Sequence, residues 1–101
     1  MKSIHRGNYR VAAWLELIDE ALQVSEQRLL DESDAVMIER VSNVVRVLQK
    51  TKDETLSGSL VPSGGVATLG FTREVLDWGE ALDSPLLKSV RTIDRYYRDH
   101  F

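Results

Sequence analysis

The first third of the chain repeats apolar residues at the three- and four-residue spacing of an α-helix. From Asn8 to about Leu30 two neighbouring apolar rows recur, and acidic and amide residues fill the remaining positions. Two adjoining rows predict a helix with a broad buried face, and Asn8, after Gly7, is its predicted N-terminal cap. The rows are Val11, Leu15, Ile18, Leu22 and Leu29, and Trp14, Leu17, Ala21 and Val24.

A second helical pattern runs from about Asp34 to Asp53. Asp31 or Ser33 is the predicted cap, because hydroxyl and carboxylate side chains satisfy the free N–H groups at a helix start. The valines of this segment also suit a β-strand, but its length and spacing favour a helix. The predicted inner face is Met37 or Ile38, Val41, Val44 or Val45, and Leu48.

Residues 57–70 have the composition of a turn. Short apolar pieces, Leu60–Val61 and Val66–Ala67, flank the sequence Pro-Ser-Gly-Gly. This pattern predicts either a small β-hairpin or an irregular loop. An isolated hairpin is marginally stable, so we expect the segment to lie against the helices.

Two shorter helices complete the prediction. Thr72 is the predicted cap of a helix that ends before Pro85 and carries Val75, Leu76, Trp78 and Leu82. Ser84 and Pro85 begin the last helix, whose inner row is Leu86, Val90, Ile93 and Tyr97. We therefore expect an all-α fold, a compact bundle of about four helices that forms a single domain over residues 1–101.

Composition narrows the function classes. The chain is 43% hydrophobic and 29% charged, has a formal net charge of -3 and contains no cysteine. The absence of cysteine excludes disulfides, thiolate metal sites and thiol nucleophiles. The basic start is followed at once by Glu16, Asp19 and Glu20, so no signal peptide or membrane span is expected. These features are typical of a cytoplasmic protein.

A basic stripe marks the last helix. Lys88, Arg91, Arg95 and Arg98 fall opposite its predicted inner row. The simplest interpretation is a solvated helix face, because cations stabilise the negative end of a helix dipole. Asp94 and Asp99 lie near enough in sequence to neutralise part of the stripe.

The same stripe is also a candidate interface. Charge is segregated along the chain: residues 11–34 and 53–83 are acidic, whereas residues 1–10, 35–52 and 84–101 are basic. If the basic segments meet on one side, the surface is bipolar and can orient a partner. Aromatic and arginine side chains together are typical of interface hot spots. The predicted partner-binding residues are Lys88, Arg91, Arg95, Tyr96 and Arg98.

Catalytic, metal and cofactor chemistry is not expected. His5 and His100 have no second histidine at ligand spacing. The acidic residues 31–34 lack the length and glycine of a calcium loop, and no lysine follows the glycine-rich segment as in a phosphate-binding loop. No nucleophile, base and acid converge, so we expect a protein that is not an enzyme.

The opening MKSIHRGNYRVAAWLELIDEAL, in a small, acidic, cysteine-free chain, resembles products of phages and mobile genetic elements, in particular the small anti-CRISPR proteins. The resemblance is one of general build and carries over no functional residue. It implies a stoichiometric inhibitor that docks on a CRISPR surveillance complex and blocks binding of target DNA.

Two alternatives use the same last helix. One is a helical DNA-binding transcriptional regulator, and the other is a homodimeric adaptor. Direct nucleic-acid binding is disfavoured, because two aspartates flank the cations and the first two helices lack the tight glycine turn of a helix-turn-helix.

Overall fold

Four α-helices account for most of the residues that the structure describes. The computed structural model describes the backbone of residues 2–65 and 69–101 and the side chains of residues 9–65 and 69–101. The helices are α1 (Lys2–Asp31), α2 (Ala35–Ser57), α3 (Phe71–Asp77) and α4 (Pro85–His100). The described residues contain no strand. The all-α bundle predicted from the sequence is confirmed.

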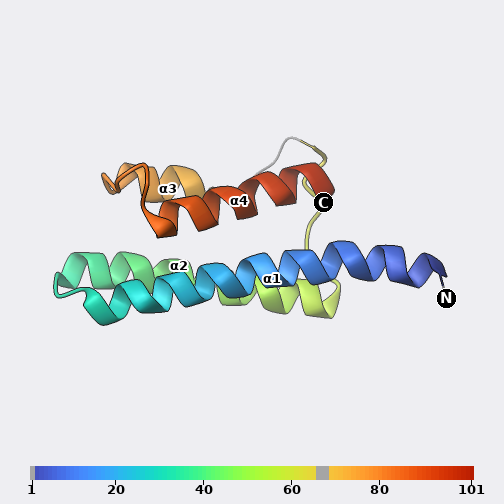
Figure 1. The fold of residues 1–101 in the computed structure, drawn as a ribbon, viewed down its shortest axis with the longest axis horizontal. Helices are drawn as coiled ribbons and strands as arrows, with labels where there is room; N and C mark the ends of the chain where they lie inside the picture. Colours follow the sequence, from blue (N-terminus) through green and yellow to red (C-terminus); the bar gives the residue numbers. More distant parts are fainter. Residues whose placement is uncertain (1, 66–68) are drawn as a thin grey trace.

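Helix α1 joins the two halves of the bundle. It packs against both α2 and α4, and α3 packs against α4. In Figure 1, α1 and α2 form one layer and α3 and α4 the other, with α1 antiparallel to both α2 and α4. The short connection between α1 and α2 enforces an antiparallel pair. One side of α4 is therefore left for α3 and solvent.

The core gathers apolar residues from all four helices, and it includes the whole predicted inner row of α4. In α1 the prediction needs adjustment, because Leu15 is only half-buried whereas Trp14 and Ala21 are fully buried. Since α2 and α4 cover α1 from two directions, its buried stripe lies between the two predicted rows. The buried apolar residues are Trp14, Ile18, Ala21, Leu22, Val41, Val44, Leu48, Phe71, Val75, Leu86, Leu87, Val90, Ile93 and Tyr97.

Three predicted helix caps are wrong, those of α1, α2 and α3, and the cap of α4 is confirmed. Asn8 lies inside α1, which begins at Lys2. The cap of α2 is Asp34, in place of Asp31 or Ser33, and its Oδ1 accepts the N–H of Val36 at 2.8 Å. Asp34 immediately precedes the first helical residue, so its side chain reaches the free N–H groups.

The cap of α4 is Ser84, as predicted, with Pro85 in the first turn. The Ser84 Oγ accepts the N–H of Leu87 at 3.2 Å.

Helix α3 is shorter than predicted. It ends at Asp77, and Gly79 follows with φ of 81°, a left-handed conformation that terminates helices. Leu82 therefore lies in the α3–α4 connection, where it is 71% exposed, and it does not contribute to the core.

The glycine-rich segment is irregular where the structure describes it. Leu60 and Val61 are not in a strand, and Gly64 and Gly65 form a turn with φ of 67° and 82°. The other half of the predicted hairpin, at residues 66–67, lies outside the described residues. The segment lies against α4, as expected, because the buried Ser63 donates its Oγ–H to the carbonyl of Arg98 at 3.1 Å.

Candidate docking groove between α3 and α4

A buried carboxylate fixes α3 on α4. Asp94 of α4 is 8% exposed, and its Oδ2 accepts the N–H of Thr72 at 2.7 Å and the Thr72 hydroxyl at 2.6 Å. The prediction that Thr72 caps α3 is therefore wrong. Gly70 precedes the helix and has no side chain that could cap it. The first N–H groups of a helix need an acceptor from outside the helix, and Asp94 of α4 provides one for α3.

Phe71 and Val75 complete the attachment of α3. Both side chains are buried and belong to the core. Arg73 lies two residues from each, so helical geometry directs it away from the core, and it is exposed. The burial of α3 thereby orients a cation towards the open side of the molecule.

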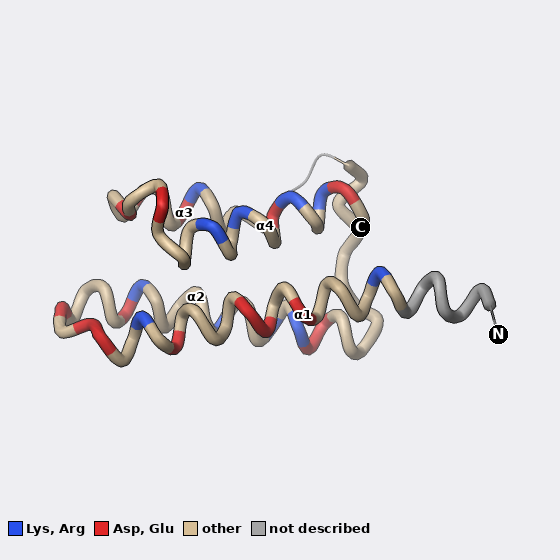
Figure 2. Tube along the Cα trace, in the orientation of Figure 1, with Lys and Arg blue, Asp and Glu red and all other residues tan. Residues whose placement is uncertain are grey.

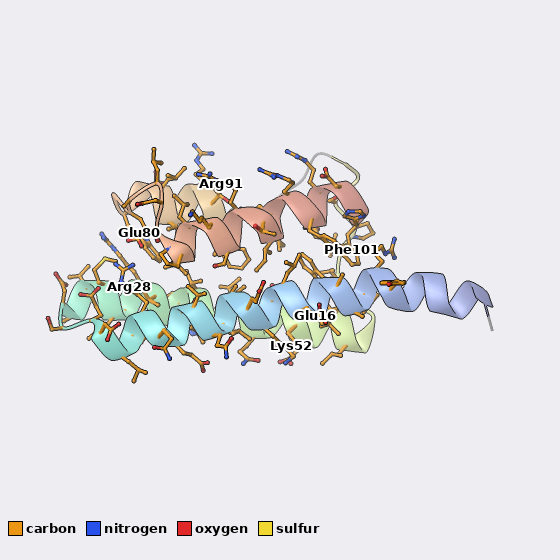
Figure 3. All side chains as sticks on the ribbon, in the orientation of Figure 1. Glu16, Arg28, Lys52, Glu80, Arg91 and Phe101 are labelled. Carbon is orange, nitrogen blue, oxygen red and sulfur yellow. The ribbon has the colours of Figure 1, made fainter. Side chains whose placement is uncertain are left out.

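The space between α3 and α4 is a groove of about 500 Å³. Arg73 supplies a cation from α3, and three arginines of the predicted stripe supply cations from α4. Figure 2 shows the basic positions on both helices, and in Figure 3 Arg91 projects away from α1 and α2. We call this site the arginine groove; it is lined by Gly70, Thr72, Arg73, Leu76, Asp77, Arg91, Asp94, Arg95 and Arg98.

Three of the four arginines in the groove form no ion pair with the described residues. Among the described residues, no ion pair or side-chain hydrogen bond involves Arg73, Arg91 or Arg95, which we call the three unpaired arginines. Arg98 pairs with its neighbour Asp99 at 3.2 Å. Of the two predicted neutralising acids, Asp99 thus acts on one arginine, whereas Asp94 bonds to Thr72.

Asp94 retains one unused acceptor. Its Oδ1 is buried and has no hydrogen-bond partner among the residues that the structure describes. Buried polar atoms are normally hydrogen-bonded, so this oxygen is an exception to that rule.

The five predicted partner-binding residues do not share one surface. Arg91, Arg95 and Arg98 line the arginine groove. Lys88 borders a separate hollow with Glu20 of α1.

Tyr96 faces α1. Its ring stacks on Trp14 with centroids 5.9 Å apart, and its hydroxyl donates to the carbonyl of Arg10 at 3.0 Å. Tyr96 therefore contributes to the contact between α1 and α4 and does not line the arginine groove.

Arg73 is the groove residue that the sequence analysis did not identify. Within α3, Arg73 lies opposite the buried positions, and this placement could have indicated an exposed cation. A single cation on a short helix is common, however, and does not by itself indicate a binding site. Its juxtaposition with the α4 stripe depends on how α3 packs, and that packing is set by Asp94 and the core.

A second polar cluster lies at the opposite end of α4. Arg28 forms ion pairs with Glu80 and with Glu32, the latter at 3.2 Å, and the Ser84 hydroxyl donates to Glu80 at 2.6 Å. Figure 3 shows Arg28 reaching from α1 towards Glu80 in the α3–α4 connection. Hydrogen bonding from Arg28 lowers the pKa of Glu80, burial opposes that shift, and the bond from Ser84 reinforces it. This cluster ties the two layers together.

The described residues contain no group of three His, Asp or Glu side chains placed to hold a metal ion. The His100 ring lies tilted against the Tyr96 ring, with centroids 4.1 Å apart. The side chain of His5, the other histidine considered from sequence, lies outside the described residues.

None of the described helices combines the length and the apolar composition that crossing a membrane requires.

Guanidinium groups on two facing helices are chemically suited to bind an anion. Each presents a planar set of donors that matches a carboxylate or phosphate in a bidentate arrangement.

No protein-family model, curated protein or solved structure matches this chain.

Proposed function

We propose that this protein is a non-enzymatic inhibitor that acts by docking its arginine groove on an acidic surface of a protein partner. The resemblance of the sequence to small anti-CRISPR proteins suggests a CRISPR surveillance complex as that partner. Docking would then block binding of target DNA. The proposed contact residues are Arg73, Arg91, Arg95 and Arg98.

The single observation that supports this proposal is that, within the part of the chain that the structure describes, three arginines in one groove have no ion-pair partner. A fold gains little from clustering like charges, whereas arginine is enriched at interfaces and pairs strongly with carboxylates. Arg73 and Arg95 are exposed and Arg91 is partly exposed, so a partner can reach them without unfolding the bundle.

Competition for DNA tests the proposal. Labelled target DNA is mixed with a purified surveillance complex from a CRISPR-bearing host, and increasing amounts of the protein are added. We expect DNA binding to fall to background near equal concentrations of protein and complex. Undiminished DNA binding would remove the anti-CRISPR assignment.

Matched variants assign the effect to the groove. The triple substitution Arg73→Gln, Arg91→Gln and Arg95→Gln should restore DNA binding by the complex. Arg46→Gln removes an exposed cation from α2, away from the groove, and should inhibit as well as the wild type. Equal inhibition by the triple variant would show that another surface docks.

A DNA-binding regulator is the second candidate, because four arginines in one groove also suit phosphate groups. Asp77 and Asp94 line the same groove and oppose a polyanion. A salt titration on duplex DNA separates the candidates, since phosphate contacts give a steep loss of affinity as salt rises. Absence of binding at low salt would eliminate the regulator.

A further inference from the structure

We propose that the arginine groove binds a short acidic segment of its partner as a linear peptide, with a carboxylate side chain seated between Arg73 on α3 and Arg91 and Arg95 on α4. This inference names the partner chemistry of the docking site and therefore rests on the function proposed above. It adds that α3 and α4 act as two walls, so that a flat acidic surface is not the preferred ligand.

Positive charge lies on both sides of the groove. Cations come from both walls, since Arg73 belongs to α3 and the other two belong to α4. A flat partner would contact only the outermost side chains. A narrow segment that enters the groove can meet guanidinium groups from both sides at once. The groove has a volume of about 500 Å³ and is open to solvent.

The acidic residues of the groove favour a peptide ligand over a polyphosphate. Asp77 and Asp94 line the groove among the arginines. A row of phosphates would place further negative charge beside them and bring no N–H group. A peptide carries N–H donors next to each of its carboxylates, so it can satisfy both signs of charge in the groove.

An apolar position refines the ligand further. Leu76 lines the α3 wall and is 40% exposed, so it offers an apolar contact to a ligand in the groove. An aliphatic residue next to the acidic one would cover this side chain. The expected ligand is therefore a segment in which glutamate or aspartate alternates with leucine, isoleucine or valine.

Fluorescence anisotropy with synthetic peptides tests the inference. The probe is a labelled peptide of alternating glutamate and leucine, compared with the same peptide carrying glutamine for glutamate. We expect saturable binding of the acidic peptide only. Arg73→Gln and Arg91→Gln should each weaken binding about tenfold or more, because each removes a charge-assisted pair. Arg46→Gln should leave the affinity unchanged.

Measurements with the other ligands and variants can overturn the inference. Equal affinity for the glutamine peptide, or no loss of affinity in Arg73→Gln, would overturn the inference. Binding of duplex DNA or inorganic phosphate in preference to the acidic peptide would also overturn it, in favour of a phosphate site. Circular dichroism of every variant checks that the bundle is intact.

The two proposals can fail separately. If Arg91→Gln and Arg95→Gln abolish inhibition of the surveillance complex while the peptide fails to bind, docking by the groove stands and the linear-segment inference falls. If the acidic peptide binds as expected but DNA binding by the complex is undiminished, the peptide site stands and the inhibitor assignment falls.

Discussion

Arginine occupies two contrasting settings in this molecule. Arg28 is enclosed by two carboxylates, and the side chain of its partner Glu80 is only 8% exposed. The three unpaired arginines of the groove have no carboxylate partner among the described residues. Both sites lie beside α4, one near its start and the other along the side that α3 covers.

The difference separates charge that holds the fold from charge that is available for binding. The Arg28 cluster connects α1 to the α3–α4 connection, so its loss loosens the contact between the two layers. The arginine groove connects only α3 with α4, and the core residues and Asp94 already provide that contact. Substitutions at the two sites should therefore affect different properties, stability at one and affinity at the other.

The largest expected effect on folding is at Arg28. Arg28→Ala leaves the nearly buried Glu80 carboxylate with Ser84 as its remaining partner. We expect a loss of about 2–3 kcal/mol in the free energy of unfolding, because hydrogen bonds to charged groups are the strongest to lose. Urea denaturation followed by circular dichroism measures it. A loss no greater than that of Arg46→Gln would remove the contrast between the two sites.

Substitution of Thr72 should affect both stability and peptide affinity. Thr72→Val removes the hydroxyl bond to Asp94 and keeps the size of the side chain. The unfolding free energy should fall by about 1 kcal/mol. Affinity for the acidic peptide should fall as well, because the α3 wall is then held less firmly. Unchanged affinity in a destabilised variant would show that the groove does not depend on this bond.

The pH dependence of stability isolates the Arg28 cluster. Because the pKa of Glu80 is lowered in the folded state, its contribution is fully present above the ordinary glutamate pKa of 4.5. That contribution is lost as the pH falls through the lowered folded pKa. Unfolding free energy measured against pH should therefore decline more steeply below about pH 4.5 in the wild type than in Glu80→Gln. Parallel curves would contradict this role for Glu80.

The smallest expected effect on folding is at Arg95. Arg95→Gln should change the unfolding free energy by no more than about 0.5 kcal/mol, as for other exposed positions without partners. The same variant should lose affinity for the acidic peptide. A destabilisation as large as that of Arg28→Ala would place Arg95 in the fold and not in the binding site.

Local patterns predicted most of the fold. The α4 row of Leu86, Val90, Ile93 and Tyr97 is buried as its spacing indicates, and Ser84 caps the helix as predicted. Choices between neighbouring candidates were less reliable, as at Asp34, since several residues near a helix start have suitable side chains. Periodicity determines which face is apolar, but the partner helices determine which of two adjoining rows is central.

Only part of the candidate site could be predicted from the sequence. The α4 stripe is a local pattern, so three of its arginines could be recognised. Arg73 joins them through a contact between residues 72 and 94, which no local pattern encodes. Tyr96 illustrates the converse, because its position beside Arg95 in sequence does not reveal that its ring lies on Trp14.

Urea unfolding of the Arg73→Gln, Arg91→Gln, Arg95→Gln variant, with and without saturating acidic peptide, tests the central claim most directly. The account predicts equal midpoints for variant and wild type without peptide, and a rise in midpoint with peptide only for the wild type, because a ligand stabilises the state that binds it. A lower midpoint for the variant without peptide, or the same rise for both proteins, would contradict it.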